Sequence, residues 1–137
     1  MKLPIHLIGL ILSSLILASC ADINTVMNAP KDAGASQIFT EDHELVKAAV
    51  LASMQNLNIN IKETSQTANN FTITFTKTIS AFSWGEVGRV LVTEMNNGDS
   101  QVFVHSEKRL KHQIAGANNR AFSGSIFSGV TEILNKN

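Results

Sequence analysis

An Asn-Gly pair between two strand-like runs is the feature that most constrains the fold. Asn97 and Gly98 separate residues 87–95 from residues 100–106, and both runs are rich in valine. Asn-Gly accepts the positive φ that a type I′ turn requires at both central positions. The sequence therefore predicts a β-hairpin. Its inward and outward positions alternate, with Val90, Val92, Val102 and Val104 on one face and Phe103 and His105 on the other.

A second alternating run precedes the hairpin. Phe71, Ile73 and Phe75 alternate with three threonines, which predicts a strand with one face on the core and a solvated threonine face. Ile59 and Ile61 also alternate with polar residues, and a turn cluster lies between the two runs. Together these runs predict an antiparallel sheet of three to four strands.

Two segments have helical spacing. Residues 40–56 begin with a plausible N-cap, Thr40, and acidic residues in the first turn, where the helix dipole favours them. The apolar stripe of this segment consists of Val46, Ala49, Val50, Ser53 and Leu57. That of the C-terminal segment consists of Phe122, Ile126, Val130, Ile133 and Leu134. We expect a two-layer α+β domain over residues 38–137, with an N-terminal and a C-terminal helix packed on one face of the sheet.

The composition argues against several kinds of site. Cys20 is the only cysteine, and the 11 basic residues equal the 11 acidic ones, so no disulfide and no drive toward nucleic acid are expected. His43, His105 and His112 follow no metal-binding spacing, so we expect no metal and no cofactor. Glu86 and Glu107 lie at strand ends, but no nucleophile pattern accompanies them. These observations favour a protein that is not an enzyme.

The first twenty residues have the parts of an export signal: Lys2, an apolar run over residues 5–17, and small residues before Cys20. The run is shorter than the roughly 20 residues that cross a bilayer. Leu17-Ala18-Ser19-Cys20 resembles the lipobox of bacterial lipoproteins. That resemblance implies cleavage between Ser19 and Cys20, removal of residues 1–19, and acylation of Cys20. Two or more acyl chains give stable membrane anchoring.

The residues after Cys20 bear on localisation. Ala21, rather than Asp, follows the lipidated position, which by analogy with enteric bacteria implies the outer membrane, facing the periplasm. In a Gram-positive cell the same anchor would face outward from the cell membrane. Residues 20–37 show no sustained period and contain Pro30, so we interpret them as the lipidated cysteine and a flexible tether.

Within the domain, Ser83-Trp84-Gly85-Glu86 opens a strand, the return strand contains Val102-x-Val104-x-Ser106, and Asn118-Asn119 leads into a helix ending Ile133-Leu134. This order resembles a group of small bacterial lipoprotein and periplasmic domains with a helix–strands–helix arrangement. The resemblance covers about residues 39–134. It implies a fold and no chemistry.

The remaining candidate residues suggest binding. Lys108, Arg109, Lys111 and Arg120 form a basic segment that could meet phosphate, lipopolysaccharide or an acidic protein, or could simply be a solvated loop. Trp84, beside Glu86, is either an anchor for a partner or a cap on the core. We hypothesise a lipid-anchored, non-enzymatic envelope protein that binds another envelope protein or component. The alternative is a hydrophobic small ligand or lipid held between sheet and helices.

Overall fold

The computed structural model of the chain describes residues 22–78, 85–109 and 119–136. Cys20 with its signal sequence, Trp84, Lys111 and His112 lie outside these residues. The elements are α2 (Ile23–Met27), the 3-10 helix η2 (Lys31–Ala33), β1 (Ala35–Phe39), α3 (His43–Asn56), β2 (Asn60–Gln66), β3 (Asn70–Lys77), β4 (Glu86–Glu94), β5 (Ser100–Lys108) and α4 (Asn119–Leu134).

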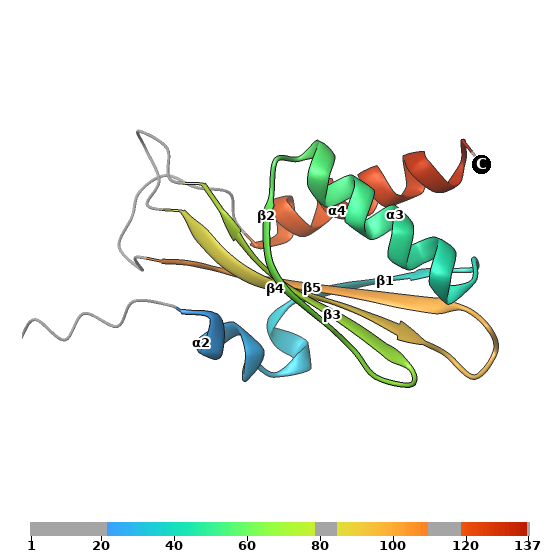
Figure 1. Ribbon diagram of the computed structural model, residues 1–137, viewed down its shortest axis with the longest axis horizontal. Helices are drawn as coiled ribbons and strands as arrows, with labels where there is room; N and C mark the ends of the chain where they lie inside the picture. The colour runs from blue at the N-terminus through green and yellow to red at the C-terminus, as the bar shows by residue number, and fades with distance from the viewer. Residues whose placement is uncertain (1–21, 79–84, 110–118, 137) are drawn as a thin grey trace, which may run out of the picture.

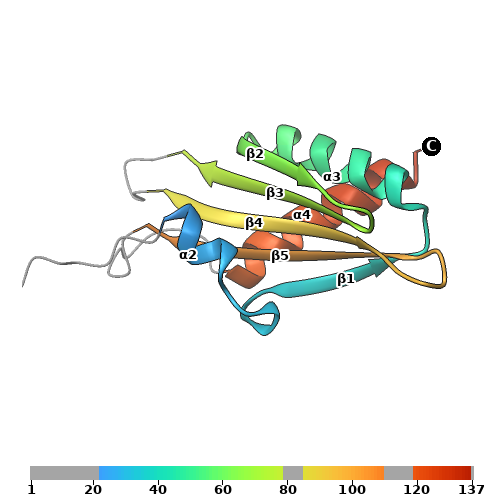
Figure 2. The same ribbon diagram turned by 60° about the horizontal axis from the view of Figure 1, so that its bottom comes forward.

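The strands form one open antiparallel sheet in the order β1-β5-β4-β3-β2. The predicted α+β class is confirmed, but the sheet has five strands instead of three to four. Helices α3 and α4 lie together on one face (Figure 1). Helix α2 lies on the opposite face (Figure 2). The predicted helix arrangement therefore holds only in part, because α3 and α4 share one face but α2, which precedes α3, forms a layer that was not predicted.

The extra strand and helix come from the segment interpreted as a tether. Residues 35–39 pair with β5 from Ala35–Val104 to Phe39–Ser100. Asp22 caps α2, since its carboxylate accepts a hydrogen bond from the Thr25 N–H at 2.9 Å. The tether interpretation is therefore wrong for residues 22–37. The segment lacks a period because each of its elements is too short to repeat an apolar position.

Helix α3 begins later than predicted. Its N-cap is Asp42 instead of Thr40, because the Asp42 carboxylate accepts from the Glu44 and Leu45 N–H groups at 2.9 and 3.2 Å. Its end at Asn56 agrees with the prediction, and the first four residues of the predicted stripe are buried. The fifth, Leu57, is instead the exposed C-cap that follows the helix.

The hairpin between β4 and β5 is confirmed, but its turn is of another type. Gly98 has a φ of +86°, whereas Asn97 has no positive φ. The Gly98 N–H donates to the Met95 carbonyl at 3.0 Å, and the Met95 N–H donates to the Asp99 carbonyl at 2.8 Å. This is the longer hairpin loop in which a type I turn is followed by one left-handed residue.

The core lies between the sheet and the pair α3–α4. The predicted inward residues Phe71, Ile73 and Phe75 are buried there with the valines of β4 and β5. The Phe75 ring stacks on Phe122 of α4, with centroids 5.3 Å apart. One continuous apolar cluster therefore joins the sheet to both helices.

The outer face of the sheet is partly covered, which corrects the expected solvated threonine face. Thr74 and Thr76 are buried. Val26 of α2 packs against Val87 of β4. Arg89 of β4 donates hydrogen bonds to two main-chain carbonyls at the end of α2, at 2.6 and 3.0 Å. Helix α2 is thus fastened to the sheet.

The two long helices approach closely at one glycine. A Cβ on Gly129 would lie 2.2 Å from the Ser53 Oγ of α3, whereas a Cβ on Gly124 would meet nothing within 4 Å. The Ser53 hydroxyl donates to the Ile126 carbonyl of α4 at 3.1 Å. Gly129 therefore permits a close contact between α4 and α3. Among the described residues, no helix has the length and apolar character needed to cross a bilayer.

Candidate functional site

The described members of the predicted binding set lie at one end of the sheet. Glu86 begins β4, Lys108 ends β5, Arg109 follows it, and Arg120 lies in the first turn of α4. Figure 1 shows the end of β3, the start of β4 and the end of β5 on the same side of the molecule. The fold brings together residues that the sequence separates. We call Lys77, Lys108, Arg109 and Arg120, together with Glu86, the basic end.

Strand register aligns three of these residues. Lys77 of β3 lies opposite Glu86, and Glu86 lies opposite Lys108, so a carboxylate stands between lysines on both neighbouring strands. Opposite charges across neighbouring strands stabilise a sheet. Glu86 is only 3% exposed, whereas Lys77 is exposed and Lys108 half-buried. The carboxyl group of Glu86 is therefore buried, whereas the lysine side chains are the part of this row that reaches the surface.

Lys77 was not singled out from the sequence, and an aromatic contact fixes its position. Its Nζ lies 5.3 Å from the centroid of the Phe122 ring. A cation over an aromatic face is worth about 0.5–1 kcal/mol at exposed sites. Phe122 is itself stacked on Phe75. The ammonium group of Lys77 is therefore held beside the start of α4. This position follows from the pairing register of β3 and β4, which the sequence alone does not give.

Two arginines complete the basic end. The Arg109 N–H donates to the Gly85 carbonyl at 3.2 Å, which continues the β4–β5 pairing past the strands. Gly85 has a φ of +89°, a conformation that glycine adopts without strain. Arg109 is half-buried and Arg120 is exposed. Guanidinium groups bind carboxylates and phosphates through paired hydrogen bonds, so this end suits an acidic partner.

The two candidate glutamates are not brought together. Glu86 and Glu107 are on adjacent strands but on opposite faces, because Glu86 aligns with Lys108 and Glu107 aligns with Val87. Glu107 instead lies 3.2 Å from the Nε2 of His105. This geometry does not place the two carboxyl groups around a common substrate position.

The described histidines have structural surroundings. His105 is buried, and its Nδ1 lies 3.0 Å from the Ala33 carbonyl, so this ring nitrogen donates and holds η2 against the sheet. His43, the first residue of α3, is also buried. Within residues 22–78, 85–109 and 119–136, no group of three or more His, Cys, Asp or Glu side chains could hold a metal ion.

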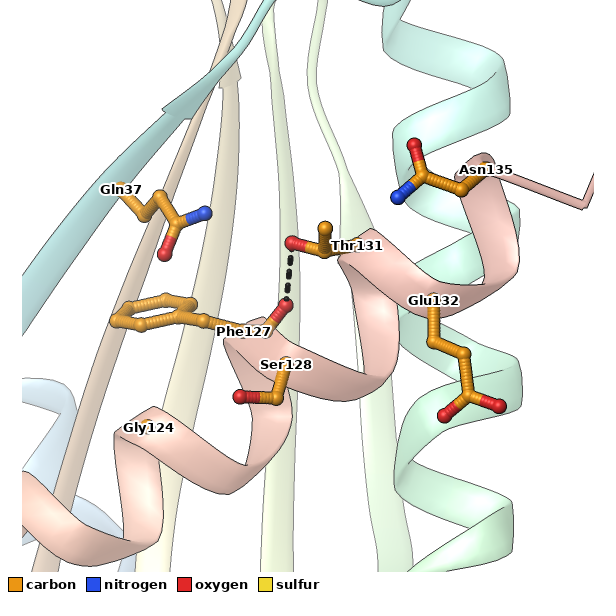
Figure 3. Close-up of a pocket in the computed structure, with 7 residues that line it drawn as sticks. All are labelled: Gln37, Gly124, Phe127, Ser128, Thr131, Glu132 and Asn135. Carbon is orange, nitrogen blue, oxygen red and sulfur yellow. Dashed lines mark hydrogen bonds between the residues drawn. The ribbon is translucent and has the colours of Figure 1, made fainter.

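A groove of about 540 Å³ runs between β1 and α4. Figure 3 shows it with its lining residues Gln37, Gly124, Phe127, Ser128, Thr131, Glu132 and Asn135. A smaller, polar hollow of about 360 Å³ lies beside His43 at the start of α3. The groove opens where the edge strand of the sheet meets α4, and the hollow lies at the start of α3. The hydrophobic-ligand alternative stays a prediction.

Comparisons with known proteins were made for the whole chain. No protein-family model and no curated protein matches it. Among solved structures, it is similar to the vertebrate conserved region (VCR) of human METTL16, with 14% sequence identity and a TM-score of 0.48 over 69% of this chain and 76% of that one. We draw nothing about function from a similarity of that extent.

Proposed function

We propose that the chain is a lipid-anchored, non-enzymatic protein of the bacterial cell envelope. In this proposal Cys20 carries the lipid after cleavage behind Ser19, and the protein faces the periplasm from the outer membrane. The basic end binds an acidic envelope protein or component, and Trp84 and Lys111, which lie outside the described residues, belong to the same binding set as predicted from the sequence. The observation that carries the binding proposal is the convergence of Lys77, Lys108, Arg109 and Arg120 from β3, β5 and α4.

The start of the fold supports anchoring close to the membrane. The described fold begins at Asp22, directly after the region of Cys20, and α2 packs on the sheet through Val26 and Arg89. A lipid on Cys20 would therefore hold the domain against the bilayer without a long flexible spacer. Such a domain would meet partners at the membrane surface.

The anchoring part is tested by the intact mass of the full-length protein purified from envelopes. We expect loss of residues 1–19 and a mass increase equal to a diacylglyceryl group, with or without a further acyl chain. Cys20→Ala should carry neither change. An unmodified cysteine on the mature chain would refute the anchor.

The binding part is tested by crosslinking and pull-down of the full-length protein from its own envelope. We compare Arg109→Gln/Arg120→Gln with Lys62→Gln/Lys136→Gln, which removes the same charge elsewhere on exposed positions. An enriched acidic partner should be lost with the first pair and kept with the second. Equal recovery with both pairs would rule out the basic end as the binding surface.

A further inference from the structure

Among the strands that the structure describes, β1 forms an edge of the sheet, because its one neighbour in the strand order is β5. Its sequence, Ala-Ser-Gln-Ile-Phe, contains no charge and no proline, and its pairing register is unbroken over residues 35–39. Edge strands normally carry charges, prolines or bulges that prevent pairing with another chain. Ile38, at its outer face, is 53% exposed. β1 therefore retains the features of a strand that can be paired.

The opposite edge shows the protection that β1 lacks. Strand β2 has a register shift between Ile61 and Glu63, with Lys62 at the irregularity. Lys62 and Glu63 are both exposed. A bulge and charged side chains on an edge strand discourage the addition of a further strand. The two edges of this sheet are thus not equivalent.

The groove beside β1 extends this surface onto α4. Gln37 forms its β1 side, and Gly124, Ser128 and Thr131 give α4 a flank of small side chains (Figure 3). The one charged residue that lines it, Glu132, pairs with Lys136 at 2.6 Å. A Cβ on Gly124 would meet nothing within 4 Å. The edge and the groove together form an open surface on both layers of the domain, on which the described charged lining residue, Glu132, is neutralised by Lys136.

We propose that this surface binds a second copy of the chain. The two β1 strands would pair antiparallel about a two-fold axis at Gln37, so that Gln37 faces Gln37, Ser36 faces Ile38 and Ala35 faces Phe39. A single added strand would form hydrogen bonds with the backbone of β1 but would leave the flank of α4 uncovered. A second copy continues both layers, because its own α4 comes to face the first across the groove. Two-fold symmetry makes such a self-complementary contact close on itself.

The symmetry fixes how the two domains are oriented. The two-fold axis of an antiparallel pair is perpendicular to the sheet, so both copies keep α2 on the same face. Both copies of α2 therefore lie on one face of the combined sheet. This inference does not rest on the proposed function, since β1 and α4 lie outside the basic end apart from the first turn of α4.

The test is sedimentation velocity of the full chain, solubilised in detergent, over a range of concentrations. We expect a monomer–dimer equilibrium for the unaltered chain. Gln37→Lys and Gln37→Glu each place like charges opposite one another, so each should raise the dissociation constant by at least about tenfold. An equimolar mixture of the two variants should recover dimer, because Lys then faces Glu. Gly124→Leu fills the groove and should also weaken the dimer.

The matched control is Ser65→Lys on the other edge, which should leave the equilibrium unchanged. Thermal melting of each variant confirms that it is folded, so loss of dimer cannot be confused with unfolding. A monomer at every concentration would overturn the proposal. So would a dimer that resists both Gln37 variants, because it would use another surface. Failure of the anchoring test would leave these results unaffected.

Discussion

Replacement of the two glycines of α4 by alanine should have opposite effects on stability. Alanine is favoured over glycine inside a helix by about 1 kcal/mol. Gly124→Ala should gain up to this amount, because the new Cβ meets nothing within 4 Å. Gly129→Ala makes the same gain, but its Cβ would lie 2.2 Å from the Ser53 Oγ and 3.1 Å from the Ser53 Cβ.

The cost at Gly129 has two parts. Relieving the overlap requires α3 and α4 to shift, and overpacking of this kind costs about 1–3 kcal/mol. Rotation of Ser53 away from the new methyl group would break its 3.1 Å hydrogen bond to Ile126, and such a bond contributes about 0.5–1.5 kcal/mol. After the helix-propensity gain is subtracted, Gly129→Ala should destabilise by about 0.5–3.5 kcal/mol.

The assay is urea denaturation followed by circular dichroism, performed in the Gln37→Lys background so that association does not contribute. Ser53→Gly supplies the control, because the nearest remaining atom, the Cα of residue 53, would be 3.7 Å from the new methyl group. In that background Gly129→Ala should become neutral or stabilising, with a coupling free energy of about 2 kcal/mol. Equal effects of both alanine substitutions, or no coupling to residue 53, would refute this account of the helix contact.

Three other predictions concern single side chains. Arg89→Gln removes two charged hydrogen bonds to the end of α2, of 2.6 and 3.0 Å. Amide exchange over residues 23–29 should therefore accelerate while β3–β5 stay protected. Arg89→Lys should not restore the protection, because a lysine ammonium group lacks the two-pronged donor geometry of a guanidinium group. Hydrogen bonds from Thr25 lower the pKa of Asp22 below its usual 3.8. The stabilisation of α2 by this cap is therefore fully present above pH 3.8 and is lost as the pH falls through the lowered pKa. Amide exchange of α2 should show this acid dependence, and the dependence should disappear in Asp22→Asn. Asp42→Ala removes the N-cap of α3 and should lower the free energy of unfolding by about 1 kcal/mol in urea denaturation.

The parts of the fold that could be predicted are those whose sequence pattern is local and repeated. Phe71, Ile73 and Phe75 alternate for long enough to identify both a strand and its buried face. Strand β1 was missed because Ala35 and Gln37 face inward without an apolar pattern. Its pairing with β5 depends on contacts across most of the chain, which no local rule can supply.

The sequence predicted some of the charged residues of the basic end, and the pairing register of the strands showed which further residues belong to it. Lys108 and Arg120 were identified from charge alone, and the fold places them at one end. Lys77 was missed because its position opposite Glu86 follows from the β3–β4 register, and Glu86 was not expected to be buried. The sequence cannot give a register when the loop between two strands has no recognisable turn motif.

The position of β1 also has a consequence for the order of folding. The hairpins β2–β3 and β4–β5 join neighbours in the chain, whereas β1 is made before them and pairs with β5, the last strand. Pairings between distant segments form late, since they require closure of a long loop. During synthesis β1 therefore cannot pair until β5, the last strand, has been made. In the finished protein it should be the strand that can detach and rejoin while the central sheet stays intact.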